Sequence, residues 1–151
     1  INFEASVPLF EEVKAQNNAV RCVFNIKDKS ISCVLKIKGF HFKRDLMETH
    51  FNEIYMESDR YPRASFKGVI PNVAISKITS EGSSVSINGK IKIRGISQPL
   101  ILKGTLKKLG NTIQLEADFE LYTDDFKIAI PNMILPKVSK KVQTKINFVL
   151  K

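Results

Sequence analysis

The alternation of apolar and polar residues at every second position is the feature that most restricts the fold of this chain. Between positions 112 and 121, five apolar side chains alternate with five polar ones: Ile113, Leu115, Ala117, Phe119 and Leu121 against Thr112, Gln114, Glu116, Asp118 and Glu120. Because successive side chains of a strand point to opposite faces, this pattern predicts a strand with one dry face and one wet face. Such strands must hide the dry face against another layer.

The same alternation predicts strands over most of the remaining chain. We expect one hairpin of residues 20–26 and 31–37 around Asp28-Lys29, and another of residues 85–93 and 100–106 around Gln98-Pro99. Further strands are expected at residues 1–5, 64–70, 126–130 and 138–150. The length of the last strand, about 13 residues, favours a tall, tilted barrel over a compact sandwich.

Two segments depart from period two. Residues 8–15 suggest a short helix, with Glu11 and Glu12 in its first turn. Residues 45–57 place Met47, Phe51 and Tyr55 on one helical stripe together with Ile54, so we expect a second helix that caps the strands.

Length and composition indicate a single domain. The chain has 151 residues, of which 43% are hydrophobic and 26% charged, with no linker, repeat or apolar run long enough for a membrane helix. The predicted fold class of residues 1–151 is therefore all-β: one extended antiparallel β-barrel of about eight strands, with one or two short helices.

Glycines and phenylalanines on the inward face leave two interpretations open. Gly68, Gly89 and Gly104 either let the strands coil at barrel corners or leave room for a long apolar ligand. The chain has ten phenylalanines and no tryptophan. Many of the rings are expected on the inward face, where they would either fill the core or form the dry wall of a cavity. The rings that the alternation places on the inward face are Phe24, Phe40, Phe42, Phe66, Phe119 and Phe148.

Catalytic and metal-binding signatures are weak. The chain has two histidines, His41 and His50, in different predicted elements, and it contains none of the common hydrolase, zinc or phosphate-loop motifs. If Ile26 pairs with Ile31, Cys22 and Cys33 are diagonal neighbours, so we expect two buried free thiols. We therefore expect a protein that is not an enzyme and that carries no metal.

The formal charge is +9, from 24 lysines and arginines against 15 acidic residues. Many of the cations are spaced by two and so expected on outer faces: Lys36, Lys38, Lys90, Lys92, Arg94, Lys137, Lys140, Lys141 and Lys145. They either keep the exterior solvated or meet anionic lipid head groups in a peripheral membrane contact. A nucleic-acid partner is not expected, because the aromatic residues lie mainly on the opposite face.

The motifs of residues 39–68, GFHFKRDLMETHFNEIYMESDRYPRASFKG, resemble the YceI-like family of lipocalin-like, polyisoprenoid-binding proteins. As in that family, Arg44-Asp45 begins the helix and Tyr61-Pro62 follows it. Residues 88–100 resemble a strand and turn of the family, and residues 125–128 resemble a motif that comes later in the family's sequences. Met47 and Lys127 depart from the family's histidine and glycine. The resemblance implies a periplasmic or secreted protein whose lipocalin-like barrel encloses an isoprenoid chain.

Together these patterns predict non-catalytic binding or carriage of an elongated apolar ligand, an isoprenoid quinone or another long-chain lipid, with no other cofactor. The expected lining residues are Phe24, Phe40, Phe42, Phe66, Gly68, Gly89, Ile91 and Phe119, and the expected lid residues are Met47, Phe51 and Tyr55. Arg44 or Tyr61 is expected to hold a polar head. The alternatives are a barrel filled by its own side chains that contacts a protein partner or anionic membrane, and an oligonucleotide-binding barrel.

Overall fold

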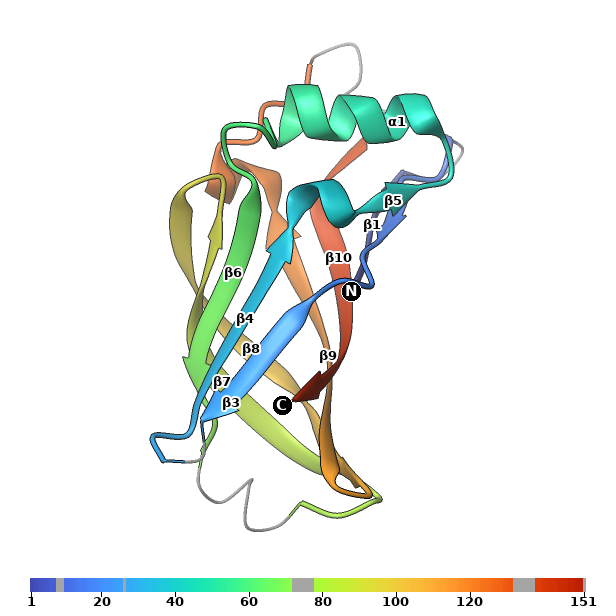
Figure 1. The fold of residues 1–151 in the computed structure, drawn as a ribbon. Coiled ribbons are helices and arrows are strands. Elements are labelled where there is room, and N and C mark those ends of the chain that lie inside the picture. The colour runs from blue at the N-terminus through green and yellow to red at the C-terminus, as the bar shows by residue number, and fades with distance from the viewer. Residues whose placement is uncertain (8–9, 26, 72–77, 132–137, 151) are drawn as a thin grey trace.

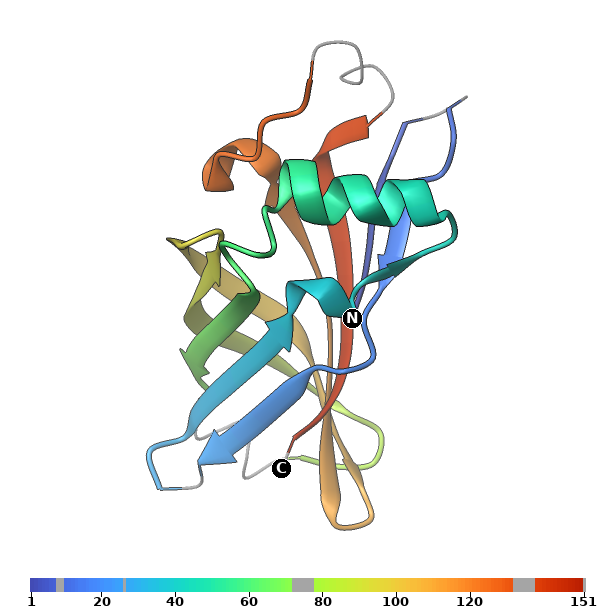
Figure 2. The ribbon, with the colours of Figure 1, turned by 45° about the horizontal axis from the view of Figure 1, so that its top comes forward.

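The computed structural model describes residues 1–7, 10–25, 27–71, 78–131 and 138–150 (Figure 1). A curled antiparallel sheet surrounds the apolar interior, and a helical segment lies across one end of it (Figures 1 and 2). The strands among the described residues are β1 Asn2–Ser6, β2 Lys14–Gln16, β3 Arg21–Asn25, β4 Ser30–Lys36, β5 His41–Phe42, β6 Arg63–Val69, β7 Ser83–Ile93, β8 Ile96–Leu109, β9 Thr112–Tyr122 and β10 Val138–Leu150.

The helical segment is α1 (Asp45–His50) continued by the wider turns of η2 (Phe51–Tyr55), and we call these eleven residues together the lid. Two short 3-10 turns are also present among the described residues. η1 (Ile37–Gly39) precedes β5, and η3 (Thr123–Phe126) follows β9. No helix among the described residues is both long and apolar enough to cross a bilayer.

The strand order in the sheet is β3-β4-β6-β7-β8-β9-β10-β1-β2-β5. The sheet curls until β3 packs near β10, without a hydrogen-bonded ladder between them among the described residues. The all-β fold class is confirmed, with ten described strands, some very short, in place of about eight. The predicted strands at residues 1–5, 64–70, 112–121 and 138–150 are present as β1, β6, β9 and β10.

The second hairpin turns four residues earlier than predicted. Ile93 pairs with Ile96, so the turn is Arg94-Gly95, and both of its residues have a positive φ, 51° and 73°. These values match the two-residue turn whose twist suits a hairpin. Pro99 lies inside β8 opposite Lys90, and in the described ladders β9 joins β8 only along residues 104–109. A proline is tolerated on a strand that has a partner on one side only.

Two other sequence predictions are wrong. Residues 10–15 contain no helix: Phe10 lies in a bend, residues 11–13 have no regular structure, and residues 14–15 belong to β2, which pairs with β1. Ser6 Oγ also accepts a hydrogen bond from Val13 N at 2.9 Å. Pro8 and Leu9 lie outside the described residues. The strand expected at residues 126–130 is absent from the described structure, because η3 ends at Phe126 and Lys127 takes a left-handed φ of 54°.

The cysteines form a disulfide, contrary to the prediction of free thiols. Cys22 pairs directly with Cys33 in the β3–β4 ladder, with their Cα atoms 4.1 Å apart, and Phe24 faces Ile31. The prediction assumed a two-residue turn, whereas residues 26–29 connect the strands, so the register moves by two. Ile26 itself lies outside the described residues. The disulfide packs in the main core with Ile31 and Phe66.

Candidate functional site

A cavity of about 480 Å³ lies between the lid and the end of the sheet that the lid covers. Its lining is mostly apolar and comes from both layers. The lid contributes Leu46, Met47, His50, Phe51 and Tyr55, and the strands contribute Phe3, Ala5, Ile91, Ile93, Phe119, Leu121 and Val142, among others. Its volume falls within the range of small-molecule binding sites.

Seven of the eleven predicted ligand-binding residues line this cavity: Phe40, Phe42, Met47, Phe51, Tyr55, Ile91 and Phe119. The other four, Phe24, Phe66, Gly68 and Gly89, lie outside its lining, and Phe24 and Phe66 belong to the main core or pack against it. Arg44 lines the cavity, whereas Tyr61 does not. Ligand binding by these residues stays a prediction.

Gly68 and Gly89 face each other in β6 and β7, and they do not open space. A Cβ atom at Gly89 would lie 2.4 Å from the carbonyl oxygen of Lys67 and 2.5 Å from the ring of Phe66. The same ring would lie 3.0 Å from a Cβ atom at Gly68. The glycines therefore allow close approach of two strands, and the Phe66 ring occupies the room beside them.

A smaller void of about 60 Å³ adjoins the cavity on the side of the disulfide. Both spaces share the lining residues Ile1, Leu35, Ala64, Ile91 and Phe119, and the smaller one also reaches Cys33 and Phe66. The interior is thus open under the lid and narrows toward a core filled by side chains.

Four phenylalanine rings fix the lid to the sheet. Phe3 of β1 lies 5.1 Å from Phe40, 5.8 Å from Phe42 and 5.5 Å from Phe51 between ring centroids. Phe51 lies 5.0 Å from Phe42, so rings from β1, β5 and the lid all meet. These spacings are favourable for aromatic pairs. Phe3 was not among the predicted site residues, although its inward parity in the first strand could have indicated it.

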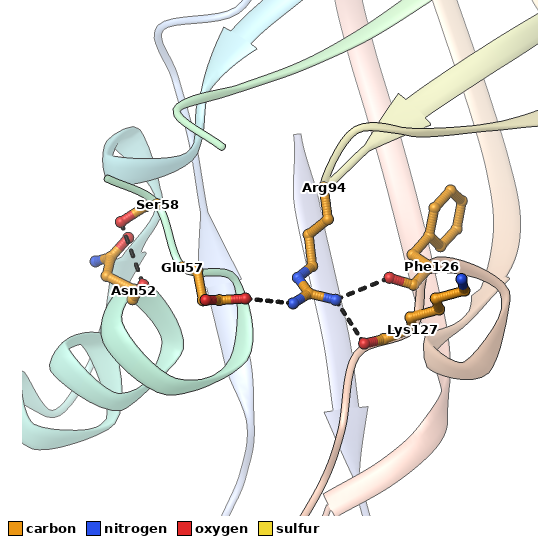
Figure 3. Close-up of polar contacts among 6 residues, drawn as sticks. All are labelled: Asn52, Glu57, Ser58, Arg94, Phe126 and Lys127. Atoms are coloured by element: carbon orange, nitrogen blue, oxygen red, sulfur yellow. Dashed lines mark hydrogen bonds and ion pairs between the residues drawn. The ribbon is translucent and has the colours of Figure 1, made fainter. Parts of the chain in front are cut away.

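Hydrogen bonds shape the two ends of the lid. Glu48 Oε1 accepts from Phe42 N at 3.0 Å and so joins the lid to β5. Met56 N donates to Phe51 O at 2.9 Å, which gives the wide turn of η2. At the far end, Ser58 N and Ser58 Oγ both donate to Asn52 O, at 2.8 and 3.3 Å (Figure 3). The lid therefore has a defined position over the cavity.

Arg94 ties three segments together beside the cavity, and we call this set of contacts the latch (Figure 3). One guanidinium nitrogen donates to the carbonyl oxygens of Phe126 and Lys127 at 3.0 and 2.5 Å, and the other contacts Glu57 Oε2 at 2.5 Å. The guanidinium also lies 5.5 Å from the centroid of the Tyr61 ring. The sequence predicted Arg94 on the outer face, but its side chain is only 13% exposed. Together these contacts join the β7–β8 turn, the end of the lid and η3.

The charged groups on the lining are few. Arg44 Nε pairs with Glu11 Oε1, so these two lining charges oppose each other, and His50 is the remaining basic side chain of the lining. Burial raises the pKa of Tyr55, so its phenol stays protonated at neutral pH. Among the described residues, no group of three or more acidic, histidine or cysteine side chains gathers as a metal site would require. The cavity is therefore suited to hold an apolar ligand.

The fold is similar to several solved structures. These include a polyisoprenoid-binding domain from Saccharophagus degradans implicated in plant cell wall breakdown (TM-score 0.85, 12% identity, covering 98% of this chain and 90% of that one). BcnA from Burkholderia cenocepacia has a TM-score of 0.78 at 15% identity, covering 99% and 95% of the two chains. The YCEI protein of Campylobacter jejuni has a TM-score of 0.74 at 14% identity, covering 95% and 86%.

No curated protein matches the sequence. The YceI-like domain, however, matches residues 1–150, almost the full length of the chain. The motifs around the lid, the curled sheet and this match agree with one another. The chain belongs to the YceI-like family.

Proposed function

We propose that this protein binds and carries an elongated apolar ligand, an isoprenoid quinone or a similar isoprenoid lipid, without altering it chemically. The observation that carries the proposal is the cavity of about 480 Å³ under the lid, with its mostly apolar lining. Residues of the lid and of the sheet face it from opposite sides, so a chain inside it would be removed from water.

Solvent exclusion accounts for the affinity. Each buried methylene contributes about 0.8 kcal/mol, so several isoprene units need few polar contacts. The aromatic cluster of Phe3, Phe40, Phe42 and Phe51 forms one wall without any polar group that must be satisfied. Met47 on the lid is flexible enough to adapt to ligands of different shape.

The similar domain from Saccharophagus degradans is described as polyisoprenoid-binding. That likeness supports the same ligand class for this chain, and the apolar lining agrees with it. The proposal depends on the shape and chemistry of the cavity.

We also propose that the protein works in an oxidising compartment, periplasmic or extracellular. The Cys22–Cys33 disulfide supports this location, because disulfides persist mainly outside the reducing cytosol. Exposed cations on the outer face, such as Lys36, Lys90 and Lys145, support a peripheral contact with anionic membranes from which a lipid could be collected.

Comigration of a radiolabelled long-chain isoprenoid quinone with the protein in gel filtration tests the proposal. Ala64 lines both the cavity and the smaller void, so the larger side chain in Ala64→Phe should occupy space in both and reduce the bound label. Lys67→Phe places the same ring on the exposed face of the same strand and should leave binding intact. Equal binding by both variants and the wild type would show that the quinone sits elsewhere.

A further inference from the structure

Thr144 is a polar residue with no polar partner inside the apolar cavity. It is 3% exposed and lines the cavity, and its hydroxyl oxygen is buried without a hydrogen-bond partner. A buried hydroxyl that makes no hydrogen bond is costly, and most buried polar groups in proteins are paired. Thr144 is therefore an exception that calls for a physical explanation, as is Thr123 of η3, whose buried hydroxyl also lines the cavity without a partner.

The position of Thr144 places it at the inner end of the cavity. On β10 it lies between Phe3 of β1 and Phe119 of β9, in one row across the sheet. Phe119 also lines the smaller void toward the disulfide, so this row marks the place where the cavity narrows. Its neighbours on the inward face of β10, Val142 and Ile146, are both apolar.

The hydroxyl is free to turn toward a ligand. Rotation of the side chain about its Cα–Cβ bond exchanges the positions of the methyl and the hydroxyl between staggered arrangements. Because the Thr144 hydroxyl makes no hydrogen bond in the structure, this rotation breaks none. A ligand oxygen at the inner end would give the hydroxyl the partner that the protein does not provide.

The charges of the lining determine what kind of oxygen fits. Arg44 is paired with Glu11, and the inward neighbours of Thr144 carry no charge. An anionic phosphate or carboxylate at this depth would be buried without a counter-charge, which is strongly unfavourable. A neutral alcohol or carbonyl oxygen needs only one hydrogen bond.

We propose that Thr144 is a hydrogen-bonding subsite for a neutral oxygen, an alcohol or a ketone, of an isoprenoid ligand that binds with this oxygen at the inner end. The inference rests on the proposed function and narrows it, because it excludes phosphorylated isoprenoids as preferred ligands. It also places the polar end of the ligand at Thr144 instead of at Arg44 or Tyr61, where the sequence had suggested a polar head.

Three probes of equal chain length test the subsite: geranylgeraniol, geranylgeranyl phosphate and the corresponding hydrocarbon. Thr144→Val keeps the shape of the side chain and removes the hydroxyl. We expect it to weaken binding of the alcohol about fivefold, the worth of one neutral hydrogen bond, and to leave the hydrocarbon unchanged. The wild type should bind the alcohol at least about tenfold more tightly than the phosphate.

Thr105→Val is the matched control, because Thr105 lies in β8 outside the lining of the cavity. It should leave all three affinities unchanged. Three results would each overturn the subsite while the proposed function stands. Thr144→Val could lose affinity for the alcohol and the hydrocarbon equally, its affinity for the alcohol could be unchanged, or the wild type could bind the phosphate more tightly than the alcohol. Failure of all three probes to bind the wild type would overturn the proposed function and the subsite with it.

Discussion

Gly89 allows β6 and β7 to approach more closely than a larger residue would permit. A Cβ atom there would lie within 2.6 Å of both Lys67 O and the Phe66 ring, so Gly89→Ala should lower the free energy of unfolding by about 1–3 kcal/mol. Urea denaturation measures this change. Ser86→Ala, on the exposed face of the same strand, should change it by less than about 0.5 kcal/mol. Equal stability of the two variants would contradict the packing described here.

The inward parity of Gly68, Gly89 and Phe66 could be predicted from the alternation of residues along each strand. Whether the glycines leave a space could not, because the answer depends on where the Phe66 ring lies relative to the neighbouring strand. The ring lies over both glycines. The same limitation explains why Phe24 and Phe66 were expected around a ligand and are found with the core.

Glu120 is a titrating residue whose environment favours the charged form. Its pKa is lowered first by the hydrogen bond from the Gln143 side chain at 3.0 Å and then by that from Lys141. A carboxyl whose pKa is lower in the folded state stabilises the fold at neutral pH, and this contribution is lost as the pH falls through the lowered pKa.

We therefore predict that Glu120→Gln is slightly less stable than the wild type at neutral pH and that the difference vanishes in acid. Urea unfolding as a function of pH measures it. Gln143→Leu removes the strongest donor and should bring the pKa of Glu120, followed by carbon NMR, back toward its ordinary value. An unchanged pKa in that variant would contradict the assignment.

Among the elements, the β3–β4 hairpin is held by the Cys22–Cys33 disulfide, which closes a loop with a sequence separation of 11 residues. Replacing both cysteines by alanine should destabilise the protein by about 3 kcal/mol, as expected for a loop of this length. Because both cysteines are buried in the folded protein, the test is made on natively extracted protein unfolded in urea, which should not react with an alkylating reagent until it is reduced. Rapid alkylation without reductant would show that the thiols are free and would remove the support for an oxidising compartment.

The latch predicts how the lid is held. Arg94→Met removes the contacts to Glu57, Phe126 and Lys127, and a hydrogen bond to a charged group contributes about 1.5–3 kcal/mol. We expect faster amide hydrogen exchange in the lid and η3, with the β3–β4 ladder unchanged. Arg94→Lys should not restore protection, because a single ammonium lacks the planar fork of donors that spans the three segments. An equal increase in exchange rate in the lid, η3 and the β3–β4 ladder of Arg94→Met would show that Arg94 supports the fold as a whole.

Most strands could be predicted at the scale of elements, because period two is a direct consequence of strand geometry. The turns could not be predicted as well. Gln98-Pro99 looked like the better turn, yet the left-handed backbone at Arg94 and Gly95 sets the hairpin, and the latch holds Arg94 there. Pairing of β2 with β1 likewise prevails over the helical tendency expected for residues 8–15, where these are described.

At the scale of the whole molecule, the curled sheet has two different halves. Toward the disulfide, side chains such as Ile31, Ile87 and Leu106 fill the interior. Under the lid, the cavity is lined by residues of β1, β4, β5, β6, β7, β9 and β10 and by four aromatic rings, and these side chains do not fill it. The family and the lid were accessible from sequence motifs, whereas the position of the cavity depends on the register of all the strands together.

Native mass spectrometry of protein purified without detergent, with organic extraction of the same sample, tests the central claim most directly. We predict a bound mass on the wild type that matches an isoprenoid in the extract, and its loss in Ala64→Phe but not in Lys67→Phe. A wild-type protein that carries no extra mass, and acquires none after incubation with geranylgeraniol or a long-chain isoprenoid quinone, would contradict the claim that the cavity holds an apolar chain.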